Sequence, residues 1–442
     1  MHRTRRSIAA LLLALLIGLG GIAPAYADPA ATADAADAAN IYRIVALGDS
    51  ISAGYEPGLE QGDIPYGYVE RLYEQALFRG RAEASNFGII GLRVEGLKRL
   101  LQAAKEQTPI TAAQLQDFSM YPRTDEIVAF AQSVADRTDE LAASLAAADL
   151  VTVVIGGNDF RPMFYDVMAQ SPAEIAVTLD EQYPLLLAEY VREYEKALRT
   201  IAEMAPHAQI IISDQYLPLP KVALNVAGKE ANLYDTLYEK VVEPLTDAID
   251  ELAAKLQADG LRIASVHVAE RFKGAEGRMT YVVSEKDNHP TQDGYEAIAK
   301  AFAGAVWPTY RSPAPREADV PISVVILGRE LESDYKPTLV NNRTFLALRD
   351  VADAMGAELE WIADTQTAVF RQNGREVAIT IGAPDIIVDG QPVPLDAPAY
   401  LRSVTVSGQV EGKTYVPLAA ISVGLGYDVQ YSKPLQTAFI NK

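Results

Sequence analysis

Short apolar runs alternate with long amphipathic stretches over residues 41–310, and this alternation constrains the fold more than any other feature. The apolar runs predict buried strands at Ile41–Leu47, Ala82–Phe87, Leu150–Ile155, Gln209–Ser213 and Ile263–Val268. Apolar residues spaced three or four positions apart predict helices at Tyr66–Phe78, Val94–Ala104, Thr124–Ala147, Pro172–Met204, Asn232–Ala258 and Gln292–Val306. Alternating strands and helices are typical of a parallel sheet covered on both faces. We therefore predict a three-layer α/β/α sandwich whose functional loops follow the C-terminal ends of the strands.

Length and composition limit what else the chain can be. The 442 residues are enough for two folded domains. Lys and Arg total 39 against 59 Asp and Glu, a net charge of −20, which argues against nucleic-acid binding. The absence of cysteine excludes disulfide scaffolds, zinc ribbons and thiol nucleophiles, and four histidines leave little for metal chemistry. We expect no cofactor and no metal site.

The N-terminus predicts export. Arg3, Arg5 and Arg6 precede an apolar stretch from Ile8 to Leu19 and small residues before Asp28, the pattern of a secretory signal peptide over residues 1–27. Cleavage after Ala27 would change the net charge from −20 to −23. The alternative is an uncleaved membrane anchor. Residues 28–40 are mostly Ala, Asp, Thr and Pro and predict a flexible leader, so we expect a secreted or cell-wall-associated protein.

A second domain follows a Pro- and charge-rich linker at residues 311–320. Residues 321–442 contain an internal repeat, in which Arg343–Leu348 is echoed by Lys413–Leu418 and Met355–Trp361 by Leu425–Tyr431. Both pairs are 70 positions apart, which indicates two copies of one strand–helix–strand unit; chance similarity is the alternative.

Turn signals between the copies predict further short strands. Asn373-Gly374 and Asp389-Gly390 are typical of hairpin turns. The strands predicted around them are Glu376–Ile381, Ile386–Val388 and Val404–Val406. The C-terminal domain is therefore expected to be a smaller, strand-rich α+β domain.

Candidate catalytic residues occur at both ends of the α/β region. Ser50 follows the first predicted strand in Gly48-Asp49-Ser50-Ile51-Ser52, where glycine allows a sharp turn, although such a triplet is often only a turn. His289 precedes the last predicted helix in Asp287-Asn288-His289-Pro290, and a serine nucleophile needs such a base. His207 and His267 lack this setting and are expected to be structural.

Two further segments offer hydrogen-bond donors for an oxyanion. Asn86–Gly91 follows the second predicted strand and Gly156–Asp159 follows the third. Glycine exposes a backbone N–H, and Asn158 adds a carboxamide. Either segment alone could be a tight turn.

Together the four segments resemble the blocks of the SGNH or GDSL hydrolases, namely Gly-Asp-Ser-x-Ser, Asn-x-Gly-x-x-Gly, Gly-x-Asn-Asp and Asp-x-x-His-Pro. The resemblance spans about residues 41–310. It implies a flavodoxin-like α/β/α fold, Ser50 as nucleophile and His289 as general base. It also implies an oxyanion hole formed by the N–H groups of Ser50 and Gly91 and the side chain of Asn158.

The sequence departs from this family at the catalytic acid. The family acid lies three residues before the histidine, where this chain has Lys286. Three arrangements could support His289. The carboxylate of Asp287 contacts the imidazole, the carboxylate of Glu285 contacts it, or a backbone carbonyl orients the ring in a Ser–His dyad. We predict Asp287.

The C-terminal repeats resemble the copper amine oxidase N-terminal domain, which implies a binding, spacer or wall-contact role. No histidine or cysteine follows His289, so copper would lack its usual ligands. The whole chain is expected to be a secreted serine esterase acting on short-chain esters, acetylated polysaccharides or lysophospholipids. The segment Leu101–Arg123 is expected to shape the acyl or sugar pocket. The alternative is a non-catalytic surface-binding protein with a degenerate scaffold, for which Lys286 is the best support.

Overall fold

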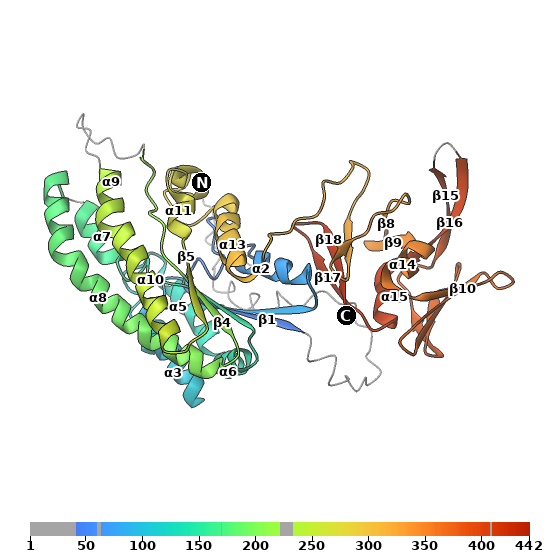
Figure 1. Ribbon diagram of the computed structural model, residues 1–442, viewed down its shortest axis with the longest axis horizontal. Coiled ribbons are helices and arrows are strands. Elements are labelled where there is room, and N and C mark those ends of the chain that lie inside the picture. Colours follow the sequence, from blue (N-terminus) through green and yellow to red (C-terminus); the bar gives the residue numbers. More distant parts are fainter. Residues whose placement is uncertain (1–40, 60–62, 169, 222–232, 407–408) are drawn as a thin grey trace, which may run out of the picture. The chain divides into compact units, whose positions relative to one another are not determined.

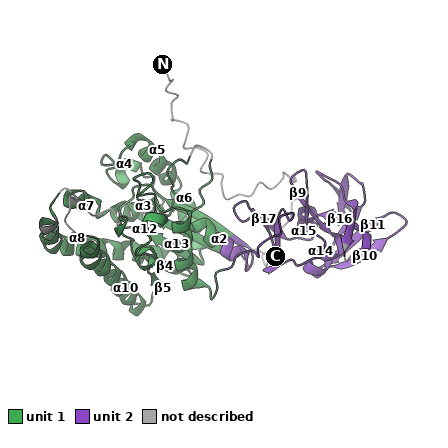
Figure 2. Ribbon diagram, turned by 90° about the horizontal axis from the view of Figure 1, so that it is seen from above, with its two compact units in different colours: residues 1–19, 42–73, 83–310 green, residues 20–41, 74–82, 311–442 purple. Residues whose placement is uncertain are grey.

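A computed structural model describes residues 41–59, 63–168, 170–221, 233–406 and 409–442. The chain divides into two compact units (Figures 1 and 2). Unit 1 contains residues 42–73 and 83–310, and unit 2 contains residues 74–82 and 311–442. The predicted signal peptide and leader lie outside the described residues. Among the described residues, no helix is long and apolar enough to span a bilayer.

Unit 1 is built on one five-stranded sheet with helices on both faces (Figure 1). Its strands are β1 (Tyr42–Gly48), β2 (Ala82–Gly88), β3 (Leu150–Val154), β4 (Gln209–Ser213) and β5 (Ile263–Val266). The order is β2-β1-β3-β4-β5, and the pairs β1–β3, β3–β4 and β4–β5 are parallel. This order reverses direction at the β1/β3 boundary, where doubly wound sheets bind ligands beyond the carboxyl ends of the strands. The predicted α/β/α sandwich is confirmed.

The helices of unit 1 largely match the predicted amphipathic stretches. They are α2 (Tyr68–Leu77), α3 (Val94–Glu106), α4 (Ala112–Leu115), α5 (Thr124–Ala135), α6 (Thr138–Ala146), α7 (Arg161–Met168), α8 (Pro172–Met204), α9 (Leu233–Leu237), η2 (Tyr238–Val242), α10 (Glu243–Ala258), α11 (Val268–Phe272), α12 (Glu276–Met279) and α13 (Gln292–Val306). Their apolar faces form one buried core with the sheet.

Three predicted boundaries were wrong. The expected helix Thr124–Ala147 is two helices, because the chain leaves helical geometry at Arg137. The expected helix Asn232–Ala258 contains the π-helical turn η2 just before Pro244, whose missing N–H cannot continue a regular helical hydrogen-bond ladder. The last strand ends at Val266, and Val268 already begins α11.

Unit 2 contains three antiparallel or mixed sheets and two helices. Its strands are β6 (Ser323–Ile326), β7 (Arg329–Glu330), β8 (Thr338–Val340), β9 (Arg343–Ala347), β10 (Glu358–Ile362), β11 (Thr367–Gln372), β12 (Arg375–Thr380), β13 (Asp385–Val388), β14 (Gln391–Pro394), β15 (Tyr400–Val406), β16 (Gln409–Pro417), β17 (Asp428–Ser432) and β18 (Thr437–Asn441), and its helices are α14 (Leu348–Met355) and α15 (Leu418–Gly424). The sheet orders are β10-β11-β12-β13-β14, β15-β16-β9-β8 and β17-β18-β6-β7. The predicted strand-rich character is confirmed.

The structure repeats with the spacing seen in the sequence. Strand β9, helix α14 and the hairpin β10–β11 recur 70 positions later as β16, α15 and the hairpin β17–β18. The predicted hairpin turns are also present, with positive φ at Asn373 and Gly374 and at Asp389 and Gly390. Both copies contribute to one buried core, whose members include Leu346 and Val416.

Candidate active site

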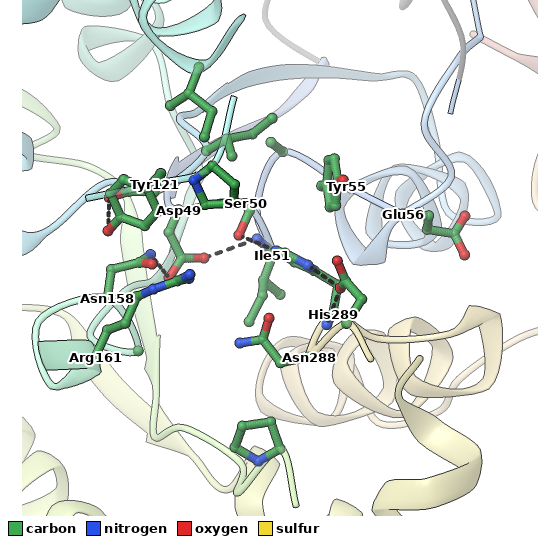
Figure 3. A pocket seen from close by; sticks show the side chains of 18 of the residues that line it. Asp49, Ser50, Ile51, Tyr55, Glu56, Tyr121, Asn158, Arg161, Asn288 and His289 are labelled. Carbon is green, nitrogen blue, oxygen red and sulfur yellow. Dashed lines mark hydrogen bonds and ion pairs between the residues drawn. The ribbon is translucent and has the colours of Figure 1, made fainter. Parts of the chain in front are cut away.

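Ser50 lies where strand β1 ends, at the reversal point of the sheet. Gly48 has φ +131°, and a Cβ atom there would lie 2.0 Å from the carbonyl oxygen of Val154. Only glycine allows this approach between the ends of β1 and β3. The chain then turns with Asp49 N–H donating to Val154 O over 3.0 Å and Tyr55 N–H donating to Ser50 O over 3.0 Å. The turn directs the serine side chain into a pocket (Figure 3).

Ser50 and His289 meet, although they lie 239 positions apart in the chain. Their Oγ and Nε2 atoms are 2.7 Å apart, and His289 Nδ1 lies 2.5 Å from Asp287 Oδ1. The same carboxylate oxygen accepts the backbone N–H of His289 over 2.9 Å. The hydroxyl, the imidazole and the carboxylate therefore form one continuous hydrogen-bonded chain. Figure 3 shows Ser50 and His289 of this chain.

The loop before His289 explains how the acid reaches the ring from two residues away. Lys286 has φ +56°, a left-handed conformation that turns the backbone immediately before Asp287. The loop is anchored by Tyr281 N–H to His289 O, at 3.0 Å, and by the Tyr216 hydroxyl to Asn288 O, at 2.7 Å. Asp287 is therefore the group that contacts His289, and exposed Glu285 makes no described side-chain contact with it.

Electrostatics favour an ionised Asp287. Burial raises the pKa of this carboxyl, but the hydrogen bond and the charge of His289 outweigh burial, and the pKa lies below its usual value. The Arg123 guanidinium acts in the same direction. An ionised Asp287 can accept the Nδ1 proton of His289, which leaves Nε2 free to accept the proton of Ser50.

The three expected oxyanion donors border the same pocket. Among the described residues, neither Ser50 N–H nor Gly91 N–H donates to a protein acceptor. Gly88 N–H, by contrast, is taken by Asn86 Oδ1 at 2.9 Å, which makes Gly91 the available donor of its segment. Asn158 Nδ2 makes only longer contacts, 3.2 Å to Leu92 O and 3.5 Å to Asp49 Oδ2 (Figure 3).

Two carboxyl groups near these donors have raised pKa values, that of Asp49, which is buried, and that of Asp159, which is half-buried. Burial raises the pKa of Asp49 to about 7. The hydrogen bond from Ile51 N–H lowers this pKa, and the negative charge of Asp159 raises it. Burial likewise raises the pKa of Asp159 to about 7, although the hydrogen bond from Val94 N–H lowers it. Asp49 braces the turn through Ile51 N–H, at 2.9 Å. Neither carboxyl contacts His289, so we assign them a structural role.

Tyr55 was not among the residues predicted from the sequence. Its ring lies edge-on to His289 with centroids 4.5 Å apart. Its hydroxyl accepts from Arg123 over 2.9 Å, and its carbonyl accepts from the Tyr295 hydroxyl over 2.6 Å. Tyr55 therefore packs against the imidazole ring, which Asp287 contacts through Nδ1.

The pocket is large and mostly apolar, with a volume of about 1210 Å³. Its apolar walls come from α5, α7, the loop after β4, the end of η2 and the start of α10, and include Phe130, Phe164, Leu217, Leu219, Val242 and Leu245. Of the segment expected to shape it, Tyr121, Pro122 and Arg123 line the pocket. Three cationic side chains also reach it, those of Arg123, Arg161 and Lys286.

His267 belongs to a different group of polar side chains. His267 Nε2 contacts both oxygens of Asp250, at 3.1 and 2.9 Å, and Ser265 Oγ donates to the same carboxylate at 2.5 Å. Here the acid bridges the serine and the histidine, so the imidazole cannot take the serine proton directly. Within the described ranges, no cluster of three His, Cys, Asp or Glu side chains could hold a metal ion.

Both regions of the chain are similar to known proteins. Residues 325–440 match the copper amine oxidase N-terminal domain. No curated protein matches the chain. Among solved structures, the lipase Lip_vut3 from a goat rumen metagenome is 17% identical, with 61% of this chain and 100% of that chain covered and a TM-score of 0.40. Phospholipase A1 from Streptomyces albidoflavus NA297 is 16% identical, with 60% of this chain and 98% of that chain covered and a TM-score of 0.36. A Clostridium thermocellum family 3 carbohydrate esterase is 14% identical, with 60% of this chain and 94% of that chain covered and a TM-score of 0.29.

The longer of the two family matches lies in the α/β region. Residues 46–297 match the model of the GDSL-like lipase/acylhydrolase family, and this range contains Ser50, Gly91, Asn158, Asp287 and His289. The matched range is more than half of the 442 residues. The chain belongs to the GDSL-like lipase/acylhydrolase family.

Proposed function

We propose that the protein hydrolyses carboxylic esters through an acyl-enzyme on Ser50. His289 Nε2 takes the hydroxyl proton while Ser50 Oγ attacks the ester carbonyl carbon. The imidazolium then gives this proton to the departing alcohol oxygen. Water attacks the acyl-enzyme with His289 again as base, and the carboxylic acid leaves.

The observation that carries this proposal is the hydrogen-bonded chain from Ser50 through His289 to Asp287, with Oγ–Nε2 and Nδ1–Oδ1 distances of 2.7 and 2.5 Å. An oxyanion beside Ser50 would accept hydrogen bonds from the Ser50 and Gly91 N–H groups and from Asn158. These donors border the pocket that contains the nucleophile. Short-chain esters, acylated polysaccharides and lysophospholipids are the substrate classes that we propose to test.

The decisive experiment measures hydrolysis of p-nitrophenyl esters by the wild type and by Ser50→Ala. We expect the variant to lose about 10³-fold or more in kcat, the usual cost of removing a triad nucleophile. Ser265→Ala is the matched control, because Ser265 belongs to the other Ser–Asp–His group, and it should keep activity within about twofold. Undiminished hydrolysis by Ser50→Ala would reject the site.

The alternative of a non-catalytic binding protein rested on Lys286 at the position of the family acid. The contact of Asp287 with His289 Nδ1 argues against that alternative. If neither wild type nor variant hydrolyses any ester in a panel of acetylated sugars and acyl esters, the binding role would be favoured.

We propose that the mature enzyme begins at Asp28 and acts outside the cytoplasm, with residues 321–442 contacting the cell wall. The support is the basic, apolar and small-residue pattern of residues 1–27. N-terminal sequencing of the exported protein tests the cleavage site, and co-sedimentation of the mature chain with cell-wall material tests the contact.

A further inference from the structure

Arg161 occupies an unusual position in the pocket. It begins helix α7, lines the pocket and lies among Tyr121 and Tyr165, with its guanidinium carbon 4.9 and 5.1 Å from the two ring centroids. Its NH2 group donates to the Tyr165 hydroxyl over 2.6 Å. Figure 3 shows the side chain extending toward Asn158, the expected oxyanion donor. The two rings thus hold a cation on the side of the pocket where Asn158 lies.

Arg161 has no carboxylate partner among the described residues, and its buried Nε atom has no acceptor there. Other arginines of unit 1 do pair with acids: Arg137 pairs with Glu140 at 2.6 Å and Arg199 with Glu195 at 2.8 Å. A partly buried guanidinium without a counter-ion costs free energy. A protein with a net charge of −20 has many acids that could have paired with it. The unpaired charge therefore points to a partner that comes with the ligand.

The other two cations of the pocket differ from Arg161. Arg123 is already engaged, donating to the Tyr55 hydroxyl at 2.9 Å and lying 3.6 Å from Glu126. Lys286 is exposed, so water can solvate its ammonium group. Among the three cationic side chains of the described pocket, only Arg161 is partly buried, contacts two aromatic rings and has no carboxylate partner.

We propose that Arg161 binds an anionic oxygen group, a carboxylate or a phosphate, carried by the ester substrate. The planar guanidinium presents parallel donors that match both groups. The mostly apolar walls would hold the hydrocarbon part of the same molecule. This inference rests on the proposed function, because it takes the pocket to be the ester-binding site.

Matched ester pairs test the inference and identify which side of the ester carries the anion. For the acyl side, the pair is p-nitrophenyl heptanoate and the p-nitrophenyl monoester of adipic acid. For the alcohol side, it is 1-octanoylglycerol and 1-octanoylglycerol 3-phosphate. Wild type, Arg161→Gln, Arg161→Lys and Arg192→Gln are compared. Arg192 is an exposed arginine of α8, so its variant removes the same charge outside the pocket.

We expect Arg161→Gln to lower kcat/KM for one of the two anionic esters about 10- to 100-fold, the usual value of a charge-assisted hydrogen bond. Hydrolysis of the neutral partner should stay within about threefold, which also shows that the variant is folded. Arg161→Lys should recover part of the loss, because it keeps the charge but not the planar fork. Equal losses on neutral and anionic esters, or no loss on either, would overturn the inference.

A binding measurement separates this inference from the proposed function. Calorimetry with hexyl phosphate on Ser50→Ala protein, with and without Arg161→Gln, needs no turnover. Binding that weakens about 10-fold or more without Arg161 supports the anion site even if no ester is hydrolysed. The anion site is rejected if both proteins bind hexyl phosphate equally or not at all. If the wild type still hydrolyses neutral and anionic esters alike through Ser50, the proposed function is supported without the anion site.

Discussion

At the scale of single residues, the acid beside His289 has an unusual spacing. Asp287 accepts both the Nδ1 proton and the backbone N–H of a histidine only two positions later. One carboxylate oxygen therefore fixes the ring and the backbone of the same residue. The left-handed turn at Lys286 makes this arrangement possible.

Asp287→Asn tests this acid. The amide removes the charge that stabilises a protonated imidazole and can hold the ring in the wrong tautomer, so kcat should fall about 10³- to 10⁴-fold. Glu285→Gln removes an exposed charge two residues away and should leave kcat within about twofold. Ester hydrolysis at pH 7 measures both, and a larger loss for Glu285→Gln would transfer the role to Glu285.

Tyr55 should act as a positioning residue. Tyr55→Ala removes the ring beside His289 and should lower kcat about 10-fold with little change in KM, because the imidazole is less well oriented. Tyr55→Phe keeps the ring and loses only the hydroxyl that accepts from Arg123, so most activity should return. Steady-state kinetics check this, and a change in KM alone would assign Tyr55 to substrate binding.

Residue-level prediction from sequence relied on local context and on the family resemblance. Ser50 and Asn158 follow predicted strands, and His289 precedes the last predicted helix with an acid beside it. Gly91 was preferred because of the family resemblance, and all four residues border one pocket. The sequence left Asp287 and Glu285 as alternatives, since the choice depends on the backbone angle of Lys286. Tyr55 and Arg161 were missed because their significance lies in contacts with His289 and with two tyrosine rings.

At the scale of secondary-structure elements, the junction of β1 and β3 depends on glycine. Gly48→Ala would force a Cβ atom to within 2.0 Å of Val154 O at a φ of +131°. We expect the free energy of unfolding to fall by about 3 kcal/mol or more, since backbone must move and strain is added. Chemical denaturation measures this effect.

Gly304→Ala is the control for that substitution. Gly304 lies inside helix α13, and no described atom outside the local helix backbone lies within 4 Å of its added Cβ. This change should be neutral or stabilise the protein by about 0.5–1 kcal/mol. If both alanine variants had the same stability, the steric argument for Gly48 would be wrong.

Element positions were predictable because apolar periodicity is a local signal. All five strands of unit 1 were located, and β4 was predicted with its observed bounds. The break between α5 and α6 was not predicted, because apolar residues continue through it in helical spacing. The short helices α4, α7, α11 and α12 were missed, since one or two turns contain too few residues to show a period.

At the scale of the whole molecule, the raised pKa values of Asp49 and Asp159 make stability depend on pH. The folded-state pKa of Asp49 and of Asp159 is about 7, above the value of 3.8 for an exposed carboxyl. The folded state therefore holds these protons more tightly than the unfolded chain. Their contribution to stability is fully present below about pH 4 and is lost as the pH rises through 7.

Asp49→Asn should reduce this dependence. An asparagine oxygen can still accept from Ile51 N–H, and the amide does not ionise. Relative to wild type, the variant should gain stability as the pH rises from 5 to 8, measured by urea denaturation at each pH. A parallel pH dependence in both proteins would show that the folded-state pKa of Asp49 is not raised above its unfolded value.

The repeat in unit 2 was predictable because its two copies keep one constant spacing. Antiparallel pairing of β9 with β16 aligns Leu346 with Val416, which are equivalent positions 70 residues apart. Tyr415, the counterpart of Phe345, lies opposite Ala347, and Pro417, the counterpart of Ala347, lies opposite Phe345. A local pseudo-twofold axis therefore passes between Leu346 and Val416. The two copies pair through equivalent strands, as the two subunits of a symmetric homodimer would. Strand β9 of one copy and strand β16 of the other therefore lie side by side in one sheet.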